Sequence, residues 1–137
     1  MDTNALTGQI IGAAMKVHTE LGPGVLESAY EACLAHELRK QGLQVEVQLP
    51  QPVEYDGILI EVGYKLDLLV EDLVIIELKA VQALLPIHEA QLLSYLRLGR
   101  KQVGLLINFH VVHLRDGIKR MVNNYQRPGD GRMGPEQ

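Results

Sequence analysis

The stretch YKLDLLVEDLVIIELKA, residues 64–80, contains two runs of large aliphatic side chains separated by two acidic residues. Runs of this length and composition are typical of β-strands that are buried on both faces. The first run nevertheless includes Asp67, and the second includes Glu77 and Lys79 near its end. Burying a charged side chain is costly unless it has an ionic partner or binds a metal. The pattern therefore indicates that these three charges have a specific partner or task.

The register of the two strands decides whether these charges meet. Glu77 and Lys79 are two residues apart, so they project to the same face of a pleated strand. A three-residue loop that pairs Val70 with Val74 places Asp67 opposite Glu77, whereas a two-residue loop places the two carboxylates on opposite faces. We predict the three-residue loop, and with it a cluster of two carboxylates and one ammonium group.

Such a cluster suits the hydrolysis of phosphodiester bonds. Paired carboxylate oxygens can hold Mg²⁺, which keeps several waters and polarises a phosphate. A lysine beside the metal can orient or activate the attacking water and offset developing negative charge. The alternative is a cross-strand ion pair that only stabilises the sheet, and the spacing of Asp67, Glu77 and Lys79 does not by itself decide between the two.

The rest of the chain reads as a succession of α and β segments. Apolar residues recur at helical spacing in two N-terminal segments, which end at Gly22 and near Gly42. From Leu43 the pattern changes to alternating or continuous apolar runs with turn residues between them, which predicts a strand meander. A third helix is expected from near Pro86 to near Gly99, and VGLLINF after it reads as a further buried strand. The predicted order is ααβββαβ, and the predicted class is α/β.

The length and composition fit one globular domain. The chain has 137 residues, of which 47% are hydrophobic and 22% charged, and we place a single domain at residues 1–126. Residues 127–137 have the composition of a flexible C-terminal tail. No apolar run is as long as a membrane span, and the N-terminal residues lack the basic region of a signal peptide, so we expect a cytoplasmic protein that contacts no membrane. Its one cysteine, Cys33, excludes an internal disulfide and reads as a core residue.

The two parts of the chain carry opposite charge. Residues 1–89 hold 5 basic and 14 acidic side chains, whereas residues 90–137 hold 8 basic and 3 acidic ones, within a net charge of −4. The basic part can steer a polyanion toward one face of the protein, and we expect Arg97 and Lys101 to contribute to that surface. The more ordinary explanation, that these basic side chains form a solvated surface, stays open.

Several motifs in the sequence resemble a known family. Asp67, followed after nine residues by Glu77-Leu78-Lys79, resembles the D-x(n)-E-x-K core of the PD-(D/E)XK nuclease-like superfamily. GVLESAY, residues 24–30, matches the segment after which the GxxExxY protein family is named. One departure is that Leu66 stands where the superfamily's nominal motif has proline. Two further stretches extend the resemblance over roughly residues 7–122, and these are His88-x-x-Gln91-x-x-x-Tyr95 and LLINF at residues 105–109.

The resemblance implies a restriction-endonuclease-like core, in which helices flank a mixed central sheet. It implies that Asp67, Glu77 and Glu27 bind Mg²⁺, with Mn²⁺ as a substitute, and that Lys79 completes the catalytic set with these three carboxylates. Together with the charge pattern, it implies that nucleic acid, DNA above all, contacts a set of residues on the helices and in the basic part of the chain. These are Tyr30, His88, Gln91, Tyr95, Arg97 and Lys101.

Several of these residues have simpler explanations that stay open. Glu27 lies in the first turn of a predicted helix, where the helix dipole stabilises a carboxylate by about 0.3–1 kcal/mol. Tyr30 shares the face of Glu27 and either orients it or simply packs. One face of the third helix carries His88, Gln91 and Tyr95. The same pattern is expected for an ordinary polar face that is exposed to solvent.

The sequence therefore supports two functions from different classes. The first is a Mg²⁺-dependent nuclease that hydrolyses phosphodiester bonds, in DNA more than in RNA. The second is a nuclease-derived module, catalytically weak or inactive, that binds nucleic acid or a protein partner. The intact set of Asp67, Glu77, Lys79 and Glu27 favours the nuclease. The small size and the few aromatic residues favour the module, or a homodimer.

Overall fold

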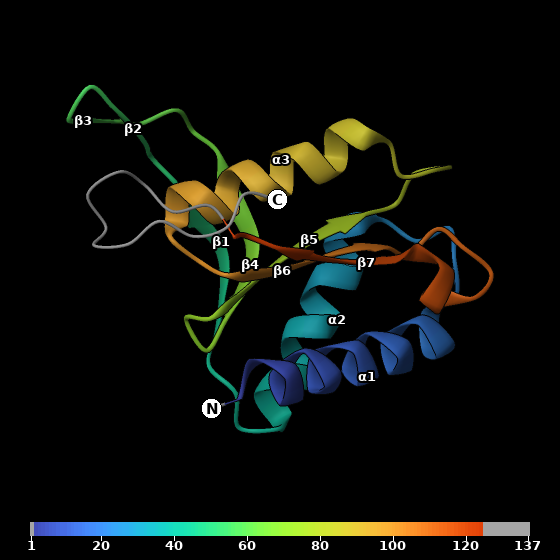
Figure 1. Ribbon diagram of the computed structural model, residues 1–137. Coiled ribbons are helices and arrows are strands. Elements are labelled where there is room, and N and C mark those ends of the chain that lie inside the picture. Colours follow the sequence, from blue (N-terminus) through green and yellow to red (C-terminus); the bar gives the residue numbers. More distant parts are fainter. Residues whose placement is uncertain (1, 125–137) are drawn as a thin grey trace.

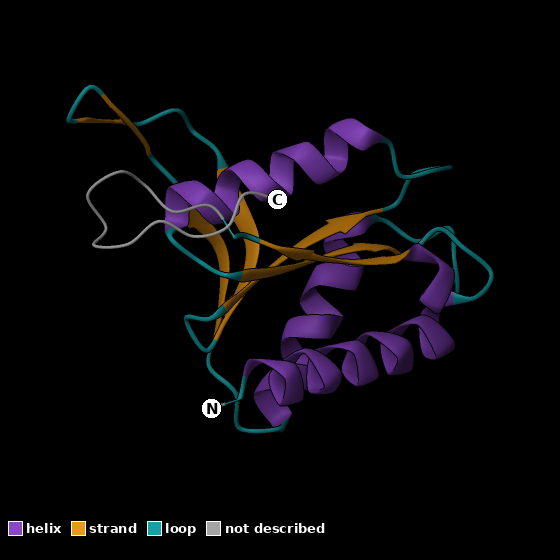
Figure 2. Ribbon diagram, in the orientation of Figure 1, coloured by secondary structure: helices purple, strands orange, loops and turns teal. Residues whose placement is uncertain are grey.

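The computed structural model describes residues 2–124 and contains a mixed β-sheet between two layers of helices (Figure 1). Helices α1 and α2 cover one face of the sheet, and helix α3 covers the other, as Figure 2 shows. The elements along the chain are α1 (Thr3–Leu21), α2 (Glu27–Lys40), β1 (Val45–Pro50), β2 (Val53–Tyr55), β3 (Ile58–Ile60), β4 (Lys65–Val70), β5 (Val74–Lys79), α3 (Pro86–Gly99), β6 (Val103–Asn108), the 3₁₀ helix η1 (Leu114–Gly117) and β7 (Ile118–Val122).

The central sheet has five strands in the order β1-β4-β5-β6-β7. Strands β5 and β6 are parallel, while every other neighbouring pair in this sheet is antiparallel. Two parallel neighbours need a crossover connection that brings the chain back to the end of the sheet where the first strand began. Helix α3 forms this connection between β5 and β6. This architecture confirms the predicted α/β class, with a mixed central sheet flanked by helices. It is consistent with the predicted restriction-endonuclease-like core.

The predicted order of elements needs two corrections. Between α2 and α3 the structure has five strands in place of the predicted three, because the meander includes a separate hairpin formed by β2 and β3. This hairpin extends away from the end of β1 (Figure 1). Strand β7 is absent from the predicted order, because its residues, IKRMV, mix charged and apolar side chains and none of them is fully buried.

The register of β4 and β5 confirms the three-residue loop. Val70 pairs with Val74, so the loop comprises residues 71–73. The first two residues of the loop have positive φ angles of 54° and 55°, which turn the chain within this short distance. Continuing the same register puts Asp67 and Glu77 side by side on adjacent strands.

The sheet separates two hydrophobic cores. The core beneath α1 and α2 is the larger one and includes Tyr30 and Phe109, both with 0% exposure. The smaller core lies beneath α3 and is centred on Leu92 and Leu96. Cys33 is partly buried against the first core, in agreement with its predicted packing role. Strands β5 and β6 supply side chains to both cores, because alternate residues point to opposite faces.

Gly117 lies where η1 packs against the C-terminal end of β6, and a Cβ atom at this position would overlap the backbone oxygen of Asn108. We expect Gly117→Ala to lower the free energy of unfolding by about 1–3 kcal/mol, because the backbone must move to admit the methyl group. Gly12→Ala is the control, since no atom lies within 4 Å of the added Cβ in α1. Alanine there should raise stability by about 0.5–1 kcal/mol. Thermal melts check both variants, and an unchanged melting temperature for Gly117→Ala would contradict this packing.

Among residues 2–124, none of the helices has the length and apolar composition needed to cross a membrane. The predicted tail, residues 127–137, lies outside the described part of the chain. The predicted domain boundary at residue 126 also falls there.

Candidate active site

Strands β4 and β5 separate at the point where Asp67 and Glu77 would pair. The last paired residues are Leu68 and Ile76. Beyond them, Oδ2 of Asp67 accepts a hydrogen bond from the backbone N–H of Leu78 at 2.8 Å, so the carboxylate takes the place of a backbone carbonyl. Strand β5 meanwhile continues beside β6 to its end. Asp67 is thereby held between the diverging strands, next to the carboxylate of Glu77.

Glu77 is a buried carboxylate, with only 6% of its surface exposed. Its Oε1 accepts a hydrogen bond from the hydroxyl of Tyr64 at 2.9 Å. Burial raises the pKa of Glu77 to about 8, and the negative charge of Asp67 adds to this rise, while the Tyr64 hydrogen bond and the Lys79 ammonium oppose it. A carboxyl group with such a pKa is protonated at neutral pH and is typical of sites that bind cations or transfer protons.

Lys79 lies at the end of β5 and is partly exposed. Its ammonium group is close enough to Glu77 to favour the ionised form of that carboxylate. Within the part of the chain that the structure describes, however, Lys79 forms no ion pair with a carboxylate. The sequence also allowed a cross-strand ion pair between Lys79 and a carboxylate, and no such pair is formed among the described residues. The Lys79 ammonium can therefore interact with another anion.

Two side chains on the α2 side of the sheet extend the cluster. Gln48 lies in β1 between two paired residues and has a positive φ of 53°, which directs its amide toward α2. Its Nε2 donates to Oε2 of Glu31 at 2.7 Å and to Oδ1 of Asp67 at 3.1 Å. Burial raises the pKa of Glu31, against the effect of the Gln48 hydrogen bond, and the charges of Asp67 and Glu27 raise it further. Negative charge thus accumulates around this amide.

Sequence reasoning missed Glu31, Gln48 and Tyr64. A signal existed for Glu31, because it follows Glu27 by four residues and therefore shares its face of α2. Glu27 itself is exposed at the start of α2. Its connection to the cluster is electrostatic, because its charge contributes to the raised pKa of Glu31. No local pattern marks Gln48 or Tyr64, because their roles depend on contacts between strands distant in sequence.

Tyr30 lies in the core and not at the surface of the site. Its ring stacks on Phe109 with centroids 4.3 Å apart, and its exposure is 0%. Its hydroxyl donates to the carbonyl oxygen of Gly22 and accepts from the N–H of Val25, which fixes the turn before α2. The structure therefore favours the packing explanation, and it corrects the expectation that Tyr30 contacts a substrate.

The three residues of the predicted stripe on α3 have different surroundings. His88 accepts a hydrogen bond at Nδ1 from the N–H of Leu85 at 3.0 Å, which satisfies a backbone group at the start of the helix. Gln91 is exposed, one turn further along. Tyr95 is partly buried, and its ring stacks on that of Tyr64 with centroids 3.7 Å apart and planes 3° apart. Of the three, Tyr95 is linked to Glu77, through Tyr64.

Two basic residues were predicted to contribute to a surface that contacts nucleic acid, and these are Lys101 and Arg97. Lys101 forms an ion pair at 2.8 Å with Asp72, in the loop between β4 and β5. Glu77 lies five positions further along the chain, and the extended part from Val74 to Glu77 alone spans about 10 Å. Lys101 therefore lies near the start of β5, and its predicted contact with nucleic acid stays a prediction. Arg97 is exposed in the last turn of α3.

The cluster offers oxygen ligands but does not form a complete metal cage. Within residues 2–124, no three histidine, cysteine, aspartate or glutamate side chains converge closely enough to hold an ion. Asp67 and Glu77 are adjacent, and Glu31 is joined to Asp67 through the amide of Gln48. The N–H groups of the Gln48 amide point at the carboxylates of Glu31 and Asp67. The space between these two carboxylates is a position where a positive charge is favoured.

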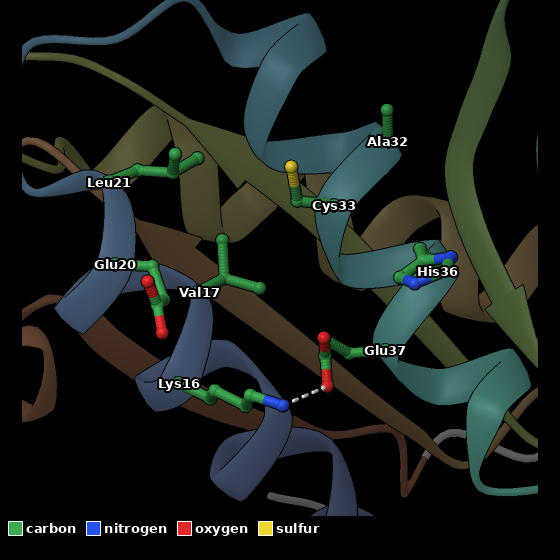
Figure 3. A pocket seen from close by; sticks show the side chains of 8 residues that line it. All are labelled: Lys16, Val17, Glu20, Leu21, Ala32, Cys33, His36 and Glu37. Atoms are coloured by element: carbon green, nitrogen blue, oxygen red, sulfur yellow. Dashed lines mark ion pairs between the residues drawn. The ribbon is translucent and has the colours of Figure 1, made fainter.

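A second feature is a pocket of about 250 Å³ between α1 and α2 (Figure 3). Cys33 and Val17 are among its lining residues, and so are Lys16 and Glu37, which form an ion pair at 3.1 Å. All lining residues come from the two helices. The pocket is therefore separate from the carboxylates on β4 and β5.

A comparison with known protein families identifies the superfamily of the chain. The sequence model of the PD-(D/E)XK nuclease superfamily matches residues 4–121, which run from the second residue of α1 to the fourth residue of β7. Asp67, Glu77 and Lys79 all fall within the matched residues. No curated protein and no solved structure matches the chain.

Proposed function

We propose, from the premise that the chain belongs to the PD-(D/E)XK nuclease superfamily, that it is a divalent-metal-dependent nuclease that acts on DNA more than on RNA. The observation that carries this proposal is the pairing of Asp67 with the buried carboxyl of Glu77, beside a lysine that forms no ion pair within residues 2–124. A purely structural cluster would be expected to neutralise its own charges.

The donor atoms of the cluster fit a hard divalent cation. Mg²⁺ and Mn²⁺ prefer carboxylate oxygens and keep several waters, so two or three carboxylates are sufficient. Asp67 and Glu77 would hold the ion, with Glu31 and Glu27 adding negative charge from α2. The Gln48 amide, which donates to two carboxylates, supports this fit, because its N–H groups lie where a cation is favoured. A bound cation would polarise the phosphate and offset its charge.

Lys79 is the proposed catalytic residue. Its ammonium is close to Glu77 and extends from the end of β5. From there it can orient the attacking water and stabilise the negative charge that develops on the phosphate. Asp67 is held in place by the N–H of Leu78, so the cluster is ordered before substrate binds.

The second candidate is a nuclease-derived module that binds nucleic acid or a protein partner without efficient cleavage. The observation that favours it is the lack of a three-ligand metal site among residues 2–124. A homodimer that brings further basic residues to the site is compatible with either function.

A cleavage assay tests the proposed function. Supercoiled plasmid, linear single-stranded DNA and RNA are incubated with the protein in Mg²⁺ or Mn²⁺, beside an Asp67→Asn variant. The expected result is metal-dependent cleavage of DNA that is lost with EDTA and reduced at least 100-fold in Asp67→Asn. Binding of DNA without cleavage under all these conditions would support the module. Equal activity of the variant would expose a contaminating nuclease and contradict the nuclease proposal.

A further inference from the structure

The carboxyl group of Glu77 is held by a hydrogen bond from the side chain of Tyr64. Tyr64 lies between the β2–β3 hairpin and β4, outside the strands. Its O–H donates to Oε1 of Glu77 at 2.9 Å. Burial raises the pKa of Tyr64 well above the ordinary value of 10, and the neighbouring charge of Glu77 adds to this rise, so the hydroxyl keeps its proton at neutral pH.

The ring of Tyr64 is held from the other side by α3. Tyr95 stacks on it almost in parallel, with planes 3° apart and centroids 3.7 Å apart. Leu92 and Leu96, the neighbours of Tyr95 on this helix, are fully buried in the smaller core. Tyr95 is therefore attached to a rigid element. Its ring fixes the orientation of the Tyr64 ring, and with it the direction of the Tyr64 hydroxyl.

We infer that Tyr64 is a positioning residue for Glu77. With Oε1 engaged by the hydroxyl, the carboxylate is held in one orientation beside Asp67, and once ionised it has further lone pairs for a cation. A hydrogen bond to a metal-binding side chain fixes its rotamer before the metal arrives, and losing such a bond commonly weakens metal affinity about 10- to 100-fold. The inference rests on the proposed metal-dependent function.

Two substitutions separate the hydroxyl from the ring. Tyr64→Phe keeps the stack and removes only the hydrogen bond to Glu77, whereas Tyr95→Phe keeps both the stack and the Tyr64 hydroxyl. Calorimetric titration of the whole chain with Mn²⁺ at pH 8 measures the effect. We expect the dissociation constant to rise about tenfold or more in Tyr64→Phe and to stay within twofold of wild type in Tyr95→Phe. Tyr95→Ala, which removes the stacking ring, should also weaken Mn²⁺ binding.

The outcomes distinguish positioning from packing. If the dissociation constant of Tyr64→Phe for Mn²⁺ stays within twofold of wild type, the inference is overturned. This holds even if the melting temperature falls, because a lower stability with unchanged Mn²⁺ affinity describes a tyrosine whose role is only structural. If Tyr64→Phe does not fold, unchanged Mn²⁺ affinity in Tyr95→Ala overturns it instead. A wild-type protein that binds no Mn²⁺ overturns the proposed function as well. Binding by wild type that Tyr64→Phe leaves unchanged overturns only the positioning role.

Discussion

Replacing Glu77 with glutamine is expected to raise the melting temperature of the metal-free protein at pH 9 by about 10 °C or more. The ionised carboxylate is unfavourable in the folded state, because it is buried and faces Asp67. The difference between the ordinary pKa of 4.5 and about 8 corresponds to roughly 4–5 kcal/mol. Glutamine carries no charge, can still accept the hydrogen bond from Tyr64, and can donate one to Asp67.

The size of this effect depends on pH, while its direction does not. Below pH 4.5 the carboxyl is protonated in both the folded and the unfolded chain, so the two proteins should melt alike. Between pH 4.5 and about 8 the unfolded chain releases the proton while the folded one keeps it, so wild-type stability declines relative to Glu77→Gln. Above about pH 8 the difference should stay constant. Differential scanning fluorimetry from pH 4 to 9.5 measures it.

Glu46→Gln is the matched control for this series. Glu46 is exposed on β1, so its substitution should shift the melting temperature by less than about 2 °C at every pH. A Glu77→Gln protein that melts at the same temperature as wild type at pH 9 would contradict the destabilising burial of this carboxylate. A decrease would mean that Glu77 stabilises the sheet.

Replacing Lys79 with methionine should lower any cleavage rate by about 100- to 10,000-fold while leaving metal binding intact. The variant keeps most of the apolar stem and removes the ammonium. Since Lys79 forms no ion pair within residues 2–124, its loss should change the melting temperature by only a few degrees. Plasmid cleavage and thermal melts on the same preparation measure both quantities.

Lys65→Met is the matched control for this prediction. Lys65→Met removes an exposed ammonium at the start of β4 and should leave cleavage within about threefold of wild type. If Lys79 instead neutralised the two carboxylates as a structural partner, its removal would cost roughly 3–5 kcal/mol and lower the melting temperature by many degrees. That result, with no cleavage by wild type, would assign the charges to the sheet.

Local patterns predicted the central part of the fold. The two aliphatic runs predicted β4 and β5, and the three-residue loop was chosen between two possible registers, of which the structure confirms the one that puts Asp67 and Glu77 on the same face. The alternation of side chains along the strands then brings these two carboxylates together. Strand β7 was missed because a mostly exposed edge strand needs no apolar pattern.

The surroundings of the carboxylates could not be predicted from local patterns. Gln48 has a positive φ within β1, and its amide bonds to Glu31 and Asp67, which lie far from it in the sequence. Tyr64 has no periodic context, since it lies between a hairpin and a strand. The charge count gave no position for Lys101 within the fold, because such a count carries no information on which end of a strand a residue lies near.

Calorimetric titration with Mn²⁺, comparing wild type with Asp67→Asn at pH 7, tests most directly whether the carboxylates of β4 and β5 form a metal site. Asparagine keeps the acceptor for the N–H of Leu78 and removes the charge, so the fold should be retained. We expect one Mn²⁺ per wild-type chain, with release of about one proton because Glu77 is protonated at this pH, and at least tenfold weaker binding by the variant. Absence of binding by wild type, or equal affinity and equal proton release in Asp67→Asn, would contradict the account.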